Sequence, residues 1–84
     1  MRKIDGKYVT TGELTKVDGT PIPEDEPLIL FRGKDKLLPG LLDHYAKLCR
    51  EAGSPPQQYQ GISQKADEIR RWQSNNQERV KVPD

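Results

Sequence analysis

The chain has 84 residues, of which 14 are basic and 13 are acidic, so its formal net charge is +1. This length allows one domain with a small core, because a chain of this size buries only roughly 60% of the surface that it exposes when unfolded. A net charge near zero excludes the strong overall field with which basic proteins hold nucleic acids or anionic membranes. Self-association is a common remedy for so small a core, and we expect a homo-oligomer.

The cysteine content and the hydrophobicity of the sequence indicate in which cellular compartment the protein is expected. A single cysteine, Cys49, excludes an internal disulfide framework and a cysteine-rich zinc site. The first twenty residues are polar and lack the apolar segment of a secretory signal, and no stretch is apolar enough to span a membrane. We therefore expect a cytoplasmic protein without membrane contact.

Residues 1–27 form a predicted hairpin and loop region. The pairs Asp5-Gly6 and Asp18-Gly19 are typical of tight turns with a positive φ. They bracket Lys7–Thr11 and Leu14–Val17, whose β-branched and aromatic content favours short strands. Three prolines then make residues 20–27 a loop, because proline cannot donate to a sheet ladder.

The segment Leu28–Arg32 is predicted to be the central strand. Its apolar run from Leu28 to Phe31 is continuous rather than alternating. Such a run is typical of a strand that is covered on both faces or lies at a subunit contact. Gly33 is expected to end the strand.

A first helix is predicted over Leu38–Ala52. Its apolar residues recur at helical spacing: Leu38, Leu41, Leu42, Tyr45, Leu48, Cys49 and Ala52. Pro39 suits the first turn, where its missing N–H has no helical partner, and Gly53 suits the left-handed position after the helix.

A second helix is predicted over Pro55–Ser74. Ser54 and Gln57 have the spacing of a capping box, with Pro55 as the first helical residue. The apolar residues again follow helical spacing: Tyr59, Ile62, Ala66, Ile69 and Trp72. Gly61 is a weak point, and the alternative is a break there with Ser63 as a new cap.

These elements predict an α+β fold in which a small antiparallel sheet of two to four strands is backed by an antiparallel helical hairpin, a ββαα-like arrangement. The helices must be antiparallel because only Gly53-Ser54 joins them. The pair Asn75-Asn76 ends the second helix, and Arg79–Val82 alternates as a short edge strand would. The single domain thus divides into residues 1–27, a strand–helix core over 28–53, the second helix over 54–75 and a tail or edge strand over 76–84.

The first candidate site is the basic turn between the predicted strand and the first helix. Arg32, Gly33, Lys34 and Lys36 combine cationic side chains with a glycine turn and a helix N-terminus, which is a chemistry that holds phosphate. The spacing matches neither the phosphate-loop motif nor the dinucleotide fingerprint. The alternative is a solvated turn that only connects two elements.

The second candidate site is Arg70-Arg71-Trp72. An indole beside guanidinium groups can stack on a base and neutralise its phosphate. Trp72 also continues the apolar stripe of the second helix, so core packing or an oligomer contact is the simpler interpretation.

No enzymatic site is predicted. Asp43 and His44 are adjacent, so on a helix their side chains project about 100° apart and do not face each other. A lone histidine does not make a triad or a common metal site. We expect no catalytic residue, no metal and no cofactor.

The chain resembles small accessory proteins of tailed phages and prophages over roughly residues 20–84. The resemblance is carried by Asp25–Pro39, His44-Tyr45, Trp72-Gln73 and Val80–Asp84. It implies a protein that acts stoichiometrically in the host cytoplasm, by binding a host enzyme, a regulator or a defence signalling nucleotide, and it assigns no catalytic residue.

The sequence therefore favours a non-enzymatic binding protein that sequesters a small anionic ligand such as a host defence signalling nucleotide. Its candidate ligand-binding residues are Arg32, Gly33, Lys34, Lys36, Arg70, Arg71 and Trp72. The alternative is an interaction module that inhibits or masks a host protein through its helices and the acidic segment Glu24–Glu26. Nucleic-acid binding is the weakest of the three hypotheses because the net charge is near zero.

Overall fold

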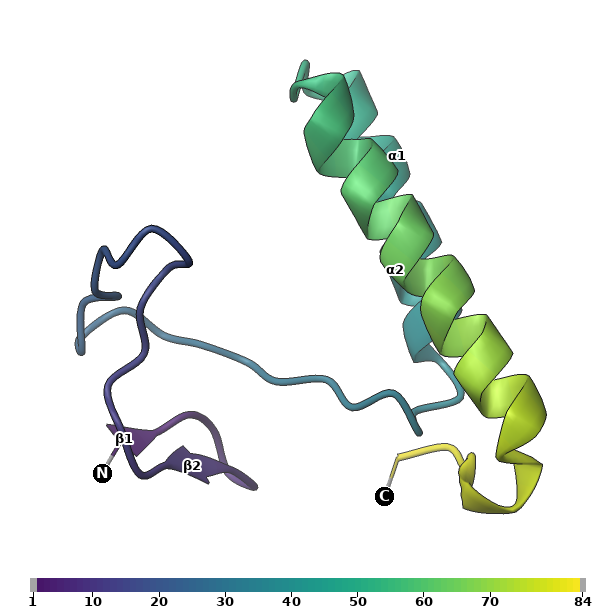
Figure 1. The fold of residues 1–84 in the computed structure, drawn as a ribbon, viewed down its shortest axis with the longest axis horizontal. Coiled ribbons are helices and arrows are strands. Elements are labelled where there is room, and N and C mark those ends of the chain that lie inside the picture. The colour runs from purple at the N-terminus through teal and green to yellow at the C-terminus, as the bar shows by residue number, and fades with distance from the viewer. Residues whose placement is uncertain (1, 84) are drawn as a thin grey trace. The chain divides into compact units, whose positions relative to one another are not determined.

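The computed structural model describes residues 2–83. Its elements are two short strands, β1 (Arg2–Lys3) and β2 (Val9–Thr10), two helices, α1 (Leu38–Glu51) and α2 (Pro56–Asn75), and a short 3-10 turn, η1 (Gln77–Arg79) (Figure 1). The chain divides into two compact units, Met1–Leu30 and Phe31–Asp84. An α+β composition, with a two-stranded antiparallel sheet and a helical hairpin, is confirmed.

The sheet of the first unit is shorter than predicted. Arg2 pairs with Thr10 and Lys3 with Val9 in antiparallel register. The Asp5 carboxylate closes the turn between them, because its Oδ1 accepts hydrogen bonds from two backbone N–H groups further along the turn, at 2.7 and 3.1 Å. The expected positive φ at Gly6 is therefore wrong: a side chain, not a glycine conformation, reverses the chain.

The second predicted turn is confirmed at Asp18-Gly19. Gly19 has a φ of +92°, and Asp18 Oδ1 accepts a hydrogen bond of 2.9 Å from the Thr20 N–H. The flanking segments meet in a single antiparallel bridge between Thr15 and Pro21 rather than in a strand over residues 14–17. Pro21 has no N–H, so it can contribute only its carbonyl to a ladder.

Arg2 fastens the loop that follows. Its guanidinium group donates to the carbonyl oxygens of Ile22 at 3.4 Å, Pro23 at 2.9 Å and Glu26 at 2.6 Å. No residue between 2 and 30 is fully buried. The first unit is thus held together by turns and polar contacts more than by an apolar core.

The two aspartate turns should make the stability of the first unit depend on pH in the acid range. The backbone N–H of Lys7 is the main cause that lowers the pKa of Asp5 below its ordinary 3.8, and the N–H of Thr20 does the same for the pKa of Asp18. A lowered pKa stabilises the folded form above the unfolded value, and this contribution is lost as the pH falls through the folded pKa. We expect the Tyr8 and Thr20 amide resonances to titrate by NMR with apparent pKa values below 3.8.

The control is Asp18→Asn, which keeps an acceptor oxygen but removes the charge. In this variant the Thr20 amide should no longer titrate in acid. Apparent pKa values at or above 3.8 in the unaltered chain would contradict the assigned turn contacts.

The predicted central strand over residues 28–32 is wrong. This segment has no ladder partner within residues 2–83, and Ile29, Leu30 and Phe31 are exposed. The physical reason is that a strand needs a neighbour, whereas the sheet of the first unit is only two residues long on each side. The continuous apolar run instead belongs to the segment that connects the first unit to the second.

Helix α1 lies where the sequence predicts it. It runs over Leu38–Glu51 with Pro39 in the first turn. It ends in a Schellman motif: Gly53 has a φ of +85°, its N–H donates to the Arg50 carbonyl at 3.2 Å, and the Ser54 N–H donates to the Cys49 carbonyl at 3.0 Å. The glycine therefore ends the helix by taking a backbone conformation that other residues avoid.

Helix α2 begins one residue later than predicted. It runs over Pro56–Asn75 with Pro55 as its N-cap, and no side chain caps it. The predicted capping box of Ser54 and Gln57 is wrong because Pro56 excludes the helical conformation at the preceding Pro55, so the helix cannot start there. Gly61 does not break the helix, and the recapping at Ser63 does not occur.

Because α2 continues through Gly61, Gly61→Ala is expected to stabilise the second unit by roughly 1 kcal/mol, the difference in helix propensity between the two residues. A Cβ at this position meets no other atom within 4 Å, so no clash offsets the gain. The measurement is chemical unfolding of both proteins. A loss of stability would indicate that the helix is not continuous at this position.

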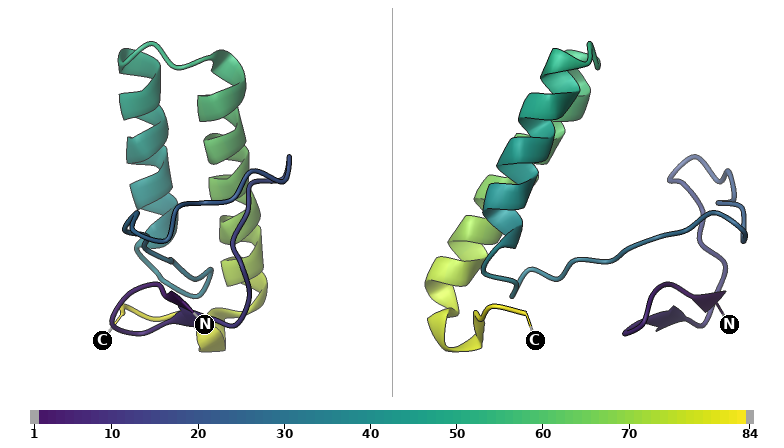
Figure 2. Two further views of the ribbon diagram at one scale, coloured as in Figure 1. Left: turned by 90° about the vertical axis from the view of Figure 1, so that its left-hand side faces the viewer. Right: turned by 180° about the vertical axis from the view of Figure 1, so that it is seen from behind.

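The two helices lie side by side in antiparallel directions, which confirms the predicted hairpin (Figures 1 and 2). Small side chains let them approach: Ala46 and Cys49 of α1 are buried, and Ala66 of α2 is completely buried. Arg70 of α2 forms an ion pair with Asp43 of α1 across the hairpin. No helix within residues 2–83 is long and apolar enough to cross a membrane.

The C-terminal segment returns to the start of α1. Asn76 Nδ2 donates to the Trp72 carbonyl at 2.8 Å, and η1 then reverses the chain. The Lys36 N–H donates to the Lys81 carbonyl at 2.9 Å, and the Lys81 N–H donates to the Lys34 carbonyl at 3.1 Å. The predicted edge strand over residues 79–82 is therefore one parallel bridge after a turn, which places η1 beside the basic loop.

Candidate functional site

The basic loop over residues 33–36 is fastened to α2 by one side chain. Gln73 Nε2 donates to the carbonyl oxygens of Gly33 at 2.9 Å and Asp35 at 2.8 Å. Asp35 Oδ1 accepts a hydrogen bond of 2.8 Å from the Leu37 N–H at the start of α1. The backbone of the loop is thus held by α2, by the start of α1 and by the C-terminal bridge.

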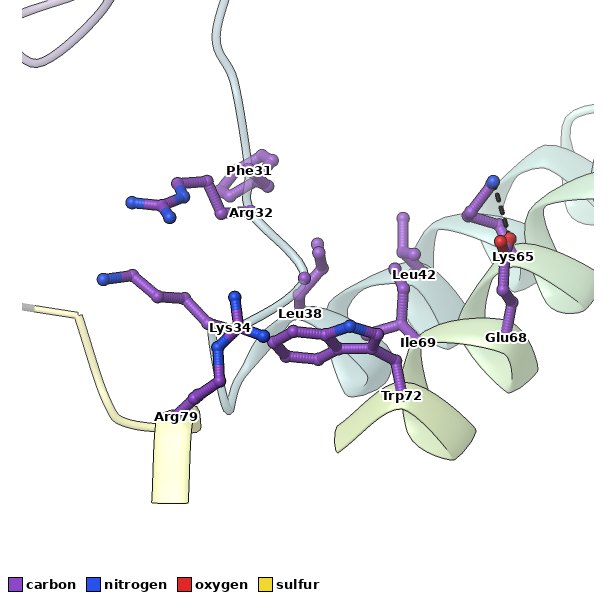
Figure 3. A pocket seen from close by; sticks show the side chains of 11 residues that line it. Phe31, Arg32, Lys34, Leu38, Leu42, Lys65, Glu68, Ile69, Trp72 and Arg79 are labelled. Carbon is purple, nitrogen blue, oxygen red and sulfur yellow. Dashed lines mark ion pairs between the residues drawn. The ribbon is translucent and has the colours of Figure 1, made fainter. Parts of the chain in front are cut away.

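A pocket of about 650 Å³ lies beside this loop within the second unit (Figure 3). We call it the Trp72 pocket. Its apolar lining consists of Phe31, Leu38, Leu42, Ile69 and Trp72. Its charged lining consists of Arg32, Lys34, Lys65, Arg79 and Glu68. Four basic side chains therefore meet one acidic side chain around an aromatic wall.

Trp72 forms this wall together with Arg79. Trp72 is half-buried, and the Arg79 guanidinium carbon lies 4.8 Å from the centroid of its ring. This is a cation–π arrangement, in which the guanidinium charge lies over the indole ring. The two residues together combine an aromatic ring with a positive charge.

The charges are distributed unevenly in the pocket. Lys65 Nζ and Glu68 Oε2 form an ion pair of 2.6 Å at one end, and the hydrogen bond from Lys65 lowers the pKa of Glu68. The side chains of Arg32, Lys34 and Arg79 gather at the other end (Figure 3). Within residues 2–83 no carboxylate forms an ion pair with any of these three. Among the described residues, this end of the pocket is therefore positively charged.

The structure brings four of the seven predicted ligand-binding residues together: Arg32, Gly33, Lys34 and Trp72. Lys36 and Arg70 instead line a separate hollow of about 480 Å³ with Gln73, Ser74, Gln77 and Val80. Arg71 is exposed and does not line the Trp72 pocket. The two sequence candidates therefore contribute to one pocket, but each only in part.

Arg70 has a structural role in this arrangement. It contacts Asp43 on the neighbouring helix and Asp67 one turn earlier on its own helix, and the Asp43 carboxylate raises the pKa of Arg70 further above its ordinary value. The pairing also shows that Asp43 is oriented toward Arg70, so an Asp43–His44 pair does not form the site.

Sequence reasoning did not identify Arg79, Lys65 or Phe31. Lys65 had a signal, because residues 65, 69 and 72 follow helical spacing and lie on one face of α2. Arg79 had no local sequence signal, because only the reversal of the chain through η1 brings its side chain over Trp72. Phe31 was assigned to a strand that does not form.

These features define a small α+β protein with an accessible pocket that is both aromatic and cationic. Comparison of the chain with family models, curated proteins and solved structures gives no match. The resemblance to small phage and prophage proteins stays a prediction.

Proposed function

We propose that the protein is a non-enzymatic binding protein that captures a small anionic ligand with an aromatic ring, such as a nucleotide, in the Trp72 pocket. The observation that supports this most is the cation–π pair of Trp72 and Arg79 next to Arg32 and Lys34, which have no ion-pair partner within residues 2–83. A base stacks on aromatic rings and on guanidinium planes alike, and a phosphate binds to clustered basic side chains.

The size of the pocket supports a small ligand. A volume of about 650 Å³ falls within the roughly 300–1,000 Å³ of typical small-molecule pockets. Leu38, Leu42, Ile69 and Trp72 lie between the Lys65–Glu68 ion pair at one end and Arg32, Lys34 and Arg79 at the other (Figure 3). This separation suits a molecule with one flat apolar end and one anionic end better than it suits inorganic phosphate alone.

Within residues 2–83 the pocket has one carboxylate, that of Glu68, and its pairing favours binding rather than catalysis. A general acid or base works best with a pKa near the operating pH. The hydrogen bond from Lys65 lowers the pKa of Glu68, which moves it further from neutral pH. The Glu68 carboxylate is also held in an ion pair with Lys65. The phage context expected from the sequence makes a host defence signalling nucleotide a natural ligand class.

Calorimetric titration of the full chain tests this proposal with three probes. A nucleotide carries the ring and the charge, its nucleoside carries only the ring, and inorganic phosphate carries only the charge. We expect linear or cyclic nucleotides to bind at least tenfold more tightly than either control, with an affinity that falls as salt is added. Absence of binding by every nucleotide at high micromolar concentration would refute the proposal.

Two arginine variants locate the binding site. Arg32→Gln removes a charge at the pocket, and we expect about a tenfold or greater loss of nucleotide affinity, because a charge-assisted hydrogen bond contributes roughly 1.5–3 kcal/mol. Arg71→Gln removes the same charge from an exposed position outside the pocket, and its affinity should stay within about twofold. Equal effects of the two changes would indicate nonspecific attraction.

Masking of a host protein is the second candidate. The acidic segment over residues 24–26 is exposed, and its loop is fixed by Arg2. A preformed acidic loop suits a basic protein surface. Ligand released by heating the purified protein favours the first candidate, whereas one stoichiometric host protein retained on the tagged chain favours the second.

A further inference from the structure

The positive charge of the Trp72 pocket comes from two segments that lie side by side in the second unit. Lys34 belongs to the basic loop, Arg32 directly precedes it, and Arg79 belongs to η1. The Lys81 N–H donates to the Lys34 carbonyl at 3.1 Å, and Arg79 lies only two residues before Lys81. Gln73 fastens the same loop to α2. These contacts bring the three cations to one end of the pocket (Figure 3).

The carboxylates nearest in sequence to these cations do not line the pocket. Asp35 lies in the basic loop, but its Oδ1 accepts a hydrogen bond of 2.8 Å from the Leu37 N–H at the start of α1. Glu78 of η1 does not line the pocket either. Glu68 does line it, but its carboxylate is paired with Lys65 at the other end. Among residues 2–83, four basic side chains and one acidic side chain line the pocket, so its lining has a net charge of +3.

We infer that the Trp72 pocket takes a nucleoside diphosphate or triphosphate in preference to a nucleotide with one phosphate, an inference that rests on the proposed nucleotide capture. Cations that are held together repel one another, and an anion of matching charge relieves that repulsion. A cyclic mononucleotide carries a single negative charge, and a nucleoside monophosphate carries about 1.5 to 2 at pH 7. Each further phosphate adds negative charge and oxygen acceptors for Arg32, Lys34 and Arg79.

The origin of the three cations also favours a chain of phosphates over a single one. Arg32 and Arg79 carry planar guanidinium groups, which bind phosphate oxygens through two parallel hydrogen bonds, whereas Lys34 contributes a point charge. A chain of two or three phosphates spreads its oxygens over a greater length than one phosphate does. It can therefore contact side chains from the loop and from η1 at the same time.

Calorimetric titration of the full chain with a matched series tests this inference. The probes are the cyclic monophosphate, monophosphate, diphosphate and triphosphate of adenosine and of guanosine, without divalent cations because these would neutralise part of the phosphate charge. We expect the triphosphate to bind at least about tenfold more tightly than the monophosphate, which corresponds to one additional charge-assisted hydrogen bond. The affinity for the triphosphate should also fall more steeply as salt is added.

Two lysine variants of the same loop locate the effect. Lys34→Gln removes a charge from the Trp72 pocket, and we expect it to lower the affinity for the triphosphate by about tenfold and that for the monophosphate by less. Lys36→Gln removes the same charge two residues further along, at the separate hollow, and should leave both affinities within about twofold. Lys34→Arg keeps the charge and should keep the preference for the triphosphate.

The outcomes separate this inference from the proposed function. Equal affinities for monophosphate and triphosphate would overturn the inference and leave nucleotide capture in place. Absence of binding by every member of the series would overturn both. Inorganic triphosphate carries the charge without the ring, so binding as tight as that of the nucleoside triphosphates would also overturn both. Equal effects of Lys34→Gln and Lys36→Gln would overturn the placement of the phosphates at this end of the pocket.

Discussion

Trp72→Ala is expected to lower nucleotide affinity by roughly tenfold to a hundredfold, because stacking on an aromatic side chain contributes about 1–3 kcal/mol per base. The substitution also removes the surface on which Arg79 lies. Trp72 is half-buried, so the free energy of unfolding should fall by less than the roughly 3–5 kcal/mol that a fully buried tryptophan contributes. Calorimetry and thermal unfolding of the variant measure the two effects.

Trp72→Phe is the matched control. It keeps an aromatic ring in the same wall of the pocket, so it should retain most of the affinity that Trp72→Ala loses. Full affinity in a folded Trp72→Ala protein would remove this residue from the site. A melting temperature unchanged by Trp72→Ala would instead show that the indole does not pack against the hairpin.

Gln73→Glu is expected to release the basic loop. The substitution keeps the shape of the side chain but replaces its two N–H donors with a carboxylate that faces the carbonyl oxygens of Gly33 and Asp35. We expect a loss of about 1–3 kcal/mol in the free energy of unfolding of the second unit, since partly buried groups lose their partners. Nucleotide affinity should fall as well, because the loop positions Arg32 and Lys34.

Gln64→Glu is the matched control for this change. It is the same substitution at an exposed position on α2, and we expect its effect on unfolding to stay within about 0.5 kcal/mol. If the Gln73→Glu and Gln64→Glu proteins have the same free energy of unfolding, the loop is not held by Gln73.

The helices could be predicted from the sequence because their signals are local. Apolar spacing, Pro39 and Gly53 defined α1, and the short connection defined the antiparallel hairpin. The N-terminus of α2 lies one residue later than the serine-cap pattern predicts, because Pro56 disfavours the helical conformation at Pro55.

The strands could not be predicted in the same way. A strand depends on a partner that can lie anywhere in the chain, and the apolar run over residues 28–31 has no such partner within the part that the structure describes. Conversely, β1 at Arg2–Lys3 has no apolar pattern and pairs because the Asp5 turn brings it against β2.

Only part of the candidate site could be predicted from the sequence, because the site also depends on contacts between distant parts of the chain. Trp72 and the basic loop could each be identified as suggestive, but their meeting depends on the Gln73 hydrogen bonds and on the return of the chain to Lys81. Arg70 does not join Trp72 in the pocket because its side chain projects toward Asp43 on α1. At about 100° per residue, positions 70 and 72 project to nearly opposite sides of the helix, so a cluster in sequence divides between two faces.

The most direct test of nucleotide capture uses the only tryptophan of the chain. Its indole Nε1–H gives a single resonance in a ¹⁵N-labelled NMR spectrum, and Trp72 lines the pocket. We predict that addition of a nucleotide shifts this resonance together with the side-chain signals of Arg79 and the amides of Arg32 and Lys34, whereas inorganic phosphate leaves the indole signal in place. An indole resonance that does not move while nucleotide is bound would contradict the proposed site.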